Sequence, residues 1–184
     1  MNYADIRPID VANGPGVRVS LFVSGCPHRC PGCFNPETWD FQYGQGFGEE
    51  QVRSILDLLR PGYIRGLTLL GGEPFEPDNQ RALLPFLRRL RRQLPDKTVW
   101  AFSGYTWEEL TGQSRARCEA TGALLSLVDV LVDGPFVEAE KSYAALFRGS
   151  ANQRLIDVPK SLAAGAVVLW ERPDPLAHFT RPES

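Results

Sequence analysis

Three cysteines lie within eight residues of one another, as Cys26-x3-Cys30-x2-Cys33 in the string SGCPHRCPGCF. A zinc knuckle usually has two C-x2-C pairs that close a tetrahedron around the metal, and here the second pair is missing. An iron–sulfur cube takes one thiolate per iron, so three thiolates leave one iron open to a ligand that is not protein. This spacing therefore indicates an iron–sulfur site whose fourth iron a bound substrate could chelate.

The loop around these cysteines is suited to a tight wrap. Its glycines free the backbone and its prolines fix φ, and backbone N–H groups in such a turn can donate to cluster sulfides and raise the reduction potential. A structural zinc site that adds His28 or Cys118 to the three cysteines is the alternative. Cys118 itself lies far along the chain in a helix-like stretch, SRARCEAT, and is expected to be a small structural residue. No role is assigned to His28.

A second unusual turn, GGEP at 71–74, follows the apolar run at 66–70. Taken alone it is an ordinary strand-to-helix turn, in which glycine supplies positive φ and proline opens the next segment. Beside a cluster with an open iron it indicates more, because a ligand that chelates iron through an amino-acid moiety would present its ammonium group to exposed backbone next to an acid. Two further polar turns end apolar runs, at Ser103 and at Asp133.

Strands and helices must hold these turns in place, and the hydrophobic pattern predicts them. Short runs rich in β-branched or other apolar residues predict strands, and apolar residues three or four apart predict helices. Thr106 followed by Glu109 has the form of a capping box and predicts the start of a helix. The predicted strands are Val17–Val23, 66–70, Thr98–Phe102, 127–132 and 167–170. The other predicted helices are 49–60 and 83–94.

The order of these elements predicts the fold class. Strands alternate with helices and are too apolar to be half exposed, which indicates a parallel sheet covered by helices. A full eight-unit barrel takes ~250 residues and a βα unit ~30, so the chain has room for about five or six units. The predicted fold is therefore α/β, an open partial (βα)5-6 TIM-like barrel with the unusual turns gathered at the C-terminal ends of its strands. Residues 1–171 are expected to form one domain and 172–184 a loose, proline-rich tail.

Length, composition and charge exclude several classes of protein. At 184 residues, with 43% hydrophobic and 23% charged residues, the chain suits one soluble domain. A net charge of −2 gives no overall field of nucleic-acid-binding strength. The longest apolar stretches are far short of the ~20 residues that span a bilayer, and no secretory signal is visible. We expect a soluble cytoplasmic protein with no nucleic acid or membrane partner.

The cysteine motif after a first strand, with GGEP after the next apolar strand, resembles the radical S-adenosylmethionine (SAM) enzymes. More closely, DVANGPGVRVSLFVSGCPHRCPGCFNPETWD resembles the activating proteins of anaerobic ribonucleoside-triphosphate reductase, as do VWAFSGYTWEEL, DVLVDGPF and LFRGSANQRLID. The similarity covers residues 1–158. The superfamily motif has an aromatic just before the third cysteine, whereas this chain has Gly32 there and Phe34 after Cys33, as is usual in that subfamily. The segment at 112–125 and the part after Pro159 depart from the family pattern.

The resemblance implies a [4Fe–4S] cluster held by Cys26, Cys30 and Cys33, with SAM chelating the fourth iron. One electron from a small low-potential donor would cleave SAM to methionine and a 5′-deoxyadenosyl radical. That radical would take a Cα hydrogen from a glycine in the large subunit of the reductase and leave a glycyl radical, while the protein places the cofactors and excludes water. The residues implied to seat SAM are Gly32, Cys33, Phe34, Gly71, Gly72, Glu73, Ser103 and Asp133.

Several residues keep two interpretations. Asp133 could contact the ribose of SAM or the partner's glycine loop, or could cap a turn or helix. Arg148 and Asn152 could touch the incoming polypeptide or make structural hydrogen bonds. The arginines at 88–92 are expected on a solvated helix face, with docking of an acidic partner as the alternative. Three tryptophans are expected to be core residues: Trp39, Trp100 and Trp107.

Two other functions remain open. One is a radical SAM enzyme that acts on a small molecule, like the carboxy-deazaguanine synthases, which would need a closed pocket that a short open barrel has little wall to build. The other is a non-catalytic iron–sulfur or zinc-binding module, which predicts a fourth protein ligand and no affinity for SAM. Replacing Cys118 by alanine separates this module from an activating enzyme, which would keep its cluster.

Overall fold

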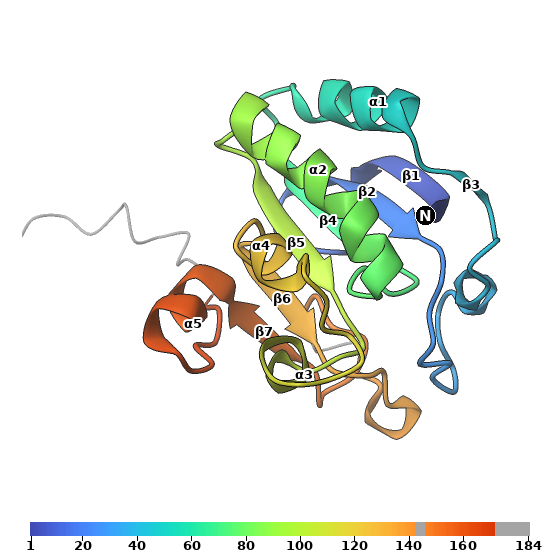
Figure 1. The fold of residues 1–184 in the computed structure, drawn as a ribbon, viewed down its shortest axis with the longest axis vertical. Helices are drawn as coiled ribbons and strands as arrows, with labels where there is room; N and C mark the ends of the chain where they lie inside the picture. Colours follow the sequence, from blue (N-terminus) through green and yellow to red (C-terminus); the bar gives the residue numbers. More distant parts are fainter. Residues whose placement is uncertain (143–145, 172–184) are drawn as a thin grey trace, which may run out of the picture.

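The computed structural model describes residues 1–142 and 146–171, and the predicted tail at 172–184 lies outside them. The described residues form one sheet of seven strands in the order β3-β1-β2-β4-β5-β6-β7 (Figure 1). The strands are β1 (Asn2–Asp10), β2 (Val17–Val23), β3 (Gln45–Gly46), β4 (Ile64–Gly71), β5 (Thr98–Phe102), β6 (Val130–Asp133) and β7 (Arg154–Asp157).

Helices cover one face of this sheet. The two long helices lie over β1, β2 and β4, and α4 lies beside them over β5 (Figure 1). The helices are α1 (Glu49–Leu59), α2 (Pro77–Gln93), α3 (Trp107–Thr111), α4 (Thr121–Leu125) and α5 (Val158–Ala164), with 3-10 turns η1 (Pro36–Trp39) and η2 (Glu138–Glu140). In the described part of the chain, no helix combines the length and the apolar character needed to cross a membrane.

The fold is α/β and its sheet is mostly parallel, as predicted, but the fold has fewer βα units than expected. The strands β2, β4, β5 and β6 are parallel, whereas β1, β3 and β7 run antiparallel to their neighbours. Three crossovers therefore join four parallel strands, and no closed barrel forms among the described residues. The predicted number of βα units was too high, because two neighbouring pairs of strands are antiparallel and have no crossover helix between them. These pairs are β1 with β2 and β6 with β7.

Several local predictions are confirmed and others need correction. The capping box starts α3: Thr106 N–H donates to Glu109 Oε2 at 2.8 Å and Glu109 N–H donates to Thr106 Oγ1 at 3.3 Å. The strand predicted at 127–132 begins only at Val130, because a turn follows α4. The strand predicted at 167–170 is a single bridge from Leu169 to Ile156 of β7. The stretch around Cys118 is a turn and not a helix.

The arginines at 88–92 are more structural than predicted. Arg89 Nη1 lies 2.6 Å from Glu49 Oε1 at the start of α1, which ties the two long helices together. Arg91 Nη2 lies 2.7 Å from Asp129 Oδ2 and donates to the carbonyl oxygen of Leu127 at 2.8 Å. These bonds hold the connection into β6, so the solvated-face interpretation does not hold for this pair.

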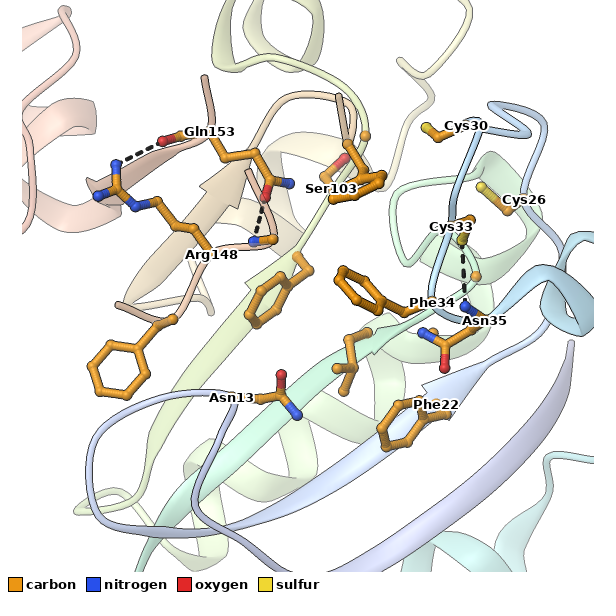
Figure 2. Close-up of a pocket in the computed structure, with 18 of the residues that line it drawn as sticks. Asn13, Phe22, Cys26, Cys30, Cys33, Phe34, Asn35, Ser103, Arg148 and Gln153 are labelled. Carbon is orange, nitrogen blue, oxygen red and sulfur yellow. Dashed lines mark hydrogen bonds between the residues drawn. The ribbon is translucent and has the colours of Figure 1, made fainter. Parts of the chain in front are cut away.

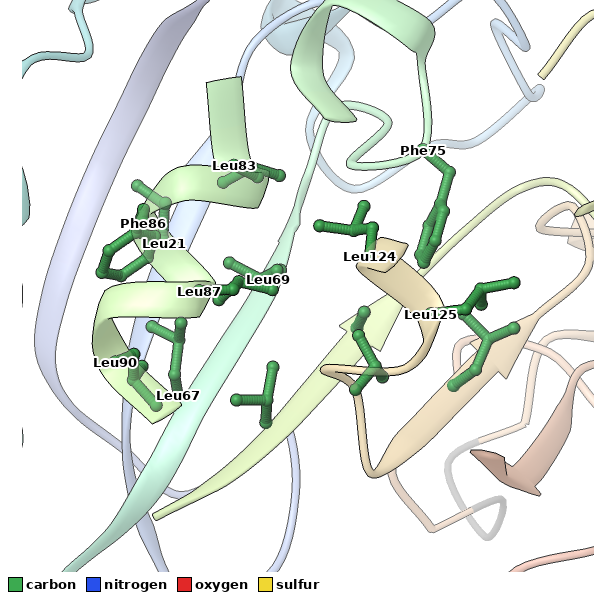
Figure 3. Packing of buried hydrophobic residues seen from close by; sticks show 14 of the residues in the cluster. Leu21, Leu67, Leu69, Phe75, Leu83, Phe86, Leu87, Leu90, Leu124 and Leu125 are labelled. Atoms are coloured by element: carbon green, nitrogen blue, oxygen red, sulfur yellow. The ribbon is translucent and has the colours of Figure 1, made fainter. Parts of the chain in front are cut away.

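Alternate residues of each strand face opposite sides of the sheet. One side packs against the helices through aliphatic and aromatic side chains, such as Leu21, Leu67 and Leu69 against Leu83 and Leu87 of α2 (Figure 3). The residues of this cluster are almost completely buried. The apolar residues that alternate along the strands thus pack against those that recur every 3.6 residues along the helices, and together they form one hydrophobic core.

Among the residues that the structure describes, no long helix lies over the other side of the sheet, and the side chains on that side are both apolar and polar. Trp100, Val130 and Val132 form a second apolar cluster there. Of the predicted core tryptophans, Trp100 and Trp107 are buried and Trp39 is half-buried. Arg18 is completely buried on this side.

On this side of the sheet, which we call the open side, the guanidinium of Arg18 lies against β4 and β5. It donates to Thr68 Oγ1 at 2.7 Å, to the carbonyl oxygen of Leu67 at 2.6 Å, and to Thr98 Oγ1 at 3.0 Å. Burial lowers its pKa to about 10, which still leaves it protonated at neutral pH. Gly66 makes room for this group of bonds, since a Cβ there would come within 1.9 Å of the Thr98 carbonyl oxygen.

Candidate functional site

A pocket of about 670 Å³ opens on the open side of the sheet (Figure 2). Phe22, Leu70 and Phe102, from three neighbouring strands, give it an apolar floor. The cysteine loop after β2 forms one side, and the loops after β4, β5 and β6 contribute the rest of the upper wall. The C-terminal ends of the parallel strands therefore meet at one site, as the sequence predicts.

All three predicted cluster cysteines reach this pocket as half-buried free thiols. Backbone N–H groups face their sulfurs. Asn35 N–H donates to Cys33 Sγ at 3.4 Å, and the backbone of Phe136, in the loop after β6, acts to lower the pKa of Cys30. Such donors favour the thiolate that binds iron.

The surroundings of Cys26 disfavour a free thiolate. Burial, with a contribution from the negative charge of Glu73, raises the pKa of the Cys26 thiol to about 12. Burial also raises the pKa of Cys30. Without a metal the Cys26 thiol therefore keeps its proton at neutral pH, and iron must displace that proton to bind.

The donor set fits an iron–sulfur cluster better than a single zinc ion. Within residues 1–142 and 146–171, no three His, Cys, Asp or Glu side chains converge closely enough to hold one ion. A cluster does not require this convergence, since each thiolate binds a different iron. His28 Nε2 is bonded to Glu73 Oε2 at 3.0 Å, and Cys118 Sγ lies 3.6 Å from Gln80 Oε1 on α2. Both alternative zinc ligands are thus engaged elsewhere.

Glu73 is completely buried, and its carboxylate joins three turns. Oε1 accepts hydrogen bonds from Phe75 N–H at 2.8 Å and from Ser103 Oγ at 2.9 Å. Oε2 accepts one from Gly104 N–H at 2.7 Å and lies 3.0 Å from His28 Nε2. A carboxylate has about four acceptor positions, and protein donors occupy all of them. The turn can therefore offer a ligand its backbone, but not this carboxylate.

The two glycines before Glu73 line the pocket and pack against the cysteine loop. Gly71 has a φ of 99°, which favours glycine. A Cβ on Gly72 would come within 2.8 Å of the Gly25 carbonyl oxygen. That oxygen accepts the N–H of Glu73 at 2.9 Å, so the turn and the base of the cysteine loop are held directly together.

Phe34 and Gly32 lie differently with respect to the pocket. Phe34 stands at its mouth with 59% of its surface exposed, and its ring centre is 5.2 Å from that of Phe136. Gly32 is not among the described residues that line the pocket. It has a φ of 71°, and a Cβ there would come within 2.8 Å of the Glu138 carboxyl group. Gly32 therefore shapes the loop without facing the cavity.

Asp133 is buried but is not one of the described residues that line the pocket. Its carboxylate accepts Trp107 N–H at 2.7 Å, at the start of α3, and Arg154 Nε at 3.0 Å. Arg154 Nη2 also lies 2.7 Å from Glu108 Oε2. These bonds join β6, α3 and β7. This is the geometry of the capping interpretation, and it lends no support to a direct contact with SAM.

Arg148 and Asn152 make structural hydrogen bonds. Arg148 lines the pocket, and its Nη1 donates to the Gln153 carbonyl oxygen at 2.9 Å (Figure 2). Asn152 Nδ2 donates to the Pro135 carbonyl oxygen at 2.8 Å, and Gln153 Nε2 to that of Gly134 at 3.0 Å. The segment before β7 is thus bound to the loop after β6, and this side of the pocket is a connected wall.

Sequence reasoning missed the loop between β1 and β2, whose residues 11–13 line the pocket. Asp10 accepts Asn13 Nδ2 at 2.7 Å and Ser20 Oγ at 2.6 Å, and the Asn13 carbonyl oxygen accepts Thr68 Oγ1 at 2.9 Å. The aspartate before a glycine-rich loop was a visible signal for a turn. Its target was not visible, because Thr68 is 55 positions away in the sequence.

Comparison with known proteins connects this site to a family. A family described as a 4Fe-4S single cluster domain matches residues 12–156, which include the cysteine loop and the turns after β4, β5 and β6. The chain is 43% identical to the anaerobic ribonucleoside-triphosphate reductase-activating protein of Haemophilus influenzae over 155 residues, 83% of this chain and 96% of that protein.

Proteins of the same name from more distant sources are similar over the same extent. The one from Escherichia coli K12 is 40% identical, with 83% of this chain and 96% of that protein covered. The one from Enterobacteria phage T4 is 39% identical, with 84% of this chain and 93% of that protein covered. The chain therefore belongs to the family of anaerobic ribonucleoside-triphosphate reductase-activating proteins.

Proposed function

We propose that this chain is a radical SAM activating enzyme that installs a glycyl radical on an anaerobic ribonucleoside-triphosphate reductase. The observation that carries the proposal is the placement of three cysteines at one end of an apolar pocket, in a chain of this family. Cys26, Cys30 and Cys33 would hold the [4Fe–4S] cluster. When bound, the cluster and SAM supply the radical that takes a hydrogen atom from the partner's glycine.

The residues proposed to seat SAM act in three ways. Gly71, Gly72 and Ser103 line the pocket beside the cysteines and offer backbone groups, while the Ser103 hydroxyl donates to Glu73 Oε1 and accepts the N–H of Tyr105. Glu73, whose carboxylate is fully engaged, acts by holding these turns together. Phe34 lies at the mouth of the pocket.

Two other predicted residues act at a distance from the pocket. Gly32 allows the loop to turn, and Asp133 fixes α3 against β7. In this proposal both support the shape of the site without touching SAM.

The floor of the pocket provides the exclusion of water that radical chemistry needs. Phe22, Leu70 and Phe102 present apolar surface directly below the cysteine loop. The mouth, by contrast, carries Phe34 at 59% and Leu146 at 48% exposure. An apolar rim that is open in the isolated chain favours a polypeptide segment as the partner that closes it over a small molecule, which would need a closed pocket of its own.

The remaining parts of the proposal follow from the family. The partner would be the large subunit of the reductase, through its glycine-bearing loop, and the electron would come from a small low-potential carrier. The chain would act in the cytoplasm. Residues 1–171 would form a single domain whose open sheet corresponds to a partial barrel of the radical SAM type.

The decisive test is anaerobic reconstitution with iron and sulfide, followed by dithionite and SAM. We expect 5′-deoxyadenosine, and an EPR-detectable glycyl radical when an anaerobic reductase is added. Release of 5′-deoxyadenosine without a glycyl radical would favour a small-molecule enzyme. A protein that forms a cluster, or binds zinc, and never cleaves SAM would be a binding module instead.

A further inference from the structure

We propose that His28 is a positioning residue for the cysteine loop, and that its hydrogen bond to Glu73 holds the loop ready for the cluster before any iron binds. The inference rests on the proposed role of Cys26, Cys30 and Cys33 as cluster ligands. It assigns to His28 a task that involves no contact with the cluster or with SAM.

The His28 side chain, only 15% exposed, fills a slot built from two separate turns. Its Nε2 lies 3.0 Å from Glu73 Oε2, and because the other partners of that carboxylate are all donors, the ring nitrogen donates here as well. The ring meets Tyr105 edge-on, with 4.4 Å between ring centres. A Cβ on Gly104 would come within 2.5 Å of His28 Cδ2, so only glycine leaves room for the ring at that position.

The cysteine loop needs such an anchor because its backbone conformation is strained and the hydrogen bond within it does not fix it to the sheet. Arg29, next to His28, has a φ of 49°, a left-handed conformation that costs free energy in any residue with a side chain. The hydrogen bond from Cys33 N–H to the Cys30 carbonyl oxygen, at 3.1 Å, closes a turn within the loop and does not tie it to the sheet. The contact of His28 with Glu73 reaches from the loop to the end of β4.

Removing the His28 side chain should loosen the loop without unfolding the protein. Glu73 would keep its bonds from Phe75 N–H, Ser103 Oγ and Gly104 N–H, so the turns after β4 and β5 would stay joined. The base of the loop would also stay fixed, because Gly25 N–H donates to the Thr38 carbonyl oxygen at 2.8 Å. What is lost is the placement of the segment between the first two cysteines.

The test compares His28→Ala and His28→Gln with Arg29→Ala, an exposed neighbour in the same loop, in the full chain. Each apo protein is reconstituted anaerobically, and its iron and sulfide content, the EPR spectrum of its reduced cluster, and the rate at which a ferrous chelator removes iron are measured. Thermal unfolding of the apo proteins reports on the fold. None of these readouts requires SAM or a reductase, so a failure of this inference and a failure of the proposed function are distinguishable.

We expect His28→Ala to lose iron to the chelator about tenfold faster than the wild type, as is typical when a residue that orients metal ligands is removed. His28→Gln should restore the wild-type rate to within about threefold, because its amide N–H can reach the same carboxylate oxygen. Arg29→Ala should match the wild type, and each apo variant should still unfold in one cooperative transition, with His28→Ala melting several degrees lower because Glu73 loses one donor. A wild-type rate in His28→Ala, or a His28→Gln protein that melts normally but loses iron as fast as His28→Ala, would overturn the proposal.

Discussion

The two faces of the central sheet are built on different principles. The helix-covered face is a core of aliphatic and aromatic side chains, in which Leu21 and Leu69 pack against α2. The open face contains a buried arginine, a fully engaged buried glutamate and an apolar pocket, and both Arg18 and Glu73 bond to partners far away in the sequence. The first face provides the main hydrophobic core, and the second face carries the proposed site.

Leu69 and Leu70 show how close these two environments lie. They are neighbours on β4, but Leu69 faces the helices and Leu70 faces the pocket. Both are buried, with 1% and 7% of their surface exposed. Burial alone therefore does not separate a core residue from a site residue here. What separates them is whether the space beyond the side chain is filled by protein or left open for a ligand.

The largest effect should come from the open face with almost no effect on the fold. Alanine at Cys26, Cys30 or Cys33 should abolish cluster assembly and 5′-deoxyadenosine formation, while the free energy of unfolding of the apo protein changes by less than about 1 kcal/mol. The measurements are iron content, nucleoside yield and urea unfolding. Cys118→Ala is the matched control and should keep its cluster. If the Cys118→Ala protein failed to assemble a cluster, Cys118 would have to be a ligand.

The pair on β4 separates the faces most directly. Leu69→Ala should lower the free energy of unfolding by about 3 kcal/mol, because it leaves a cavity in a filled core. Leu70→Ala should cost only about half of that, because water can enter the space beside the pocket, but it should weaken SAM binding. Urea denaturation and SAM titration of the reconstituted proteins test this. Equal costs for the two substitutions would mean that the pocket floor is as tightly packed as the core.

Arg18 tests whether the polar part of the open face supports stability. Arg18→Met keeps much of the volume but leaves the Leu67 and Thr98 carbonyl oxygens without this donor, and should cost about 2 kcal/mol. Arg65→Met, on the neighbouring strand but exposed, should stay within about 0.5 kcal/mol of the wild type. Urea unfolding of the apo proteins gives both values. An unchanged free energy of unfolding in Arg18→Met would show that an apolar side chain at this position stabilises the fold equally well.

The smallest expected effect is a change in acid sensitivity. Burial raises the pKa of the Asp10 carboxyl, but the hydrogen bonds from Ser20 and Asn13 together lower it by more than burial raises it. The net pKa therefore lies below its usual value. A carboxyl with a lowered pKa stabilises the fold above its unfolded pKa of about 3.9 and loses this contribution as the pH falls through the folded value. Asp10→Asn should therefore flatten the loss of stability on acidification from about pH 5 to 3. The readout is the urea midpoint against pH, with Asp96→Asn, an exposed carboxylate, expected to follow the wild type.

Sequence reasoning succeeded where the signal was local. The helix periodicity, the capping box at Thr106 and the three cysteines each lie within a few residues, so propensity and spacing are enough to identify them. It failed where the partner is remote. Asp133 read equally well as a ligand contact and as a cap, and only its bonds to Trp107 and Arg154 favour the cap.

The sequence by itself indicated the metal group of this protein, because the type and spacing of Cys26, Cys30 and Cys33 favour an iron–sulfur cluster with one open iron over a zinc site. The helix-covered face was also determined, since periodicity selects which residues are buried. Only the tertiary structure decided what Glu73 and His28 do. Their contact joins turns 45 positions apart, and a bond of that kind depends on the packing of whole strands and not on local sequence.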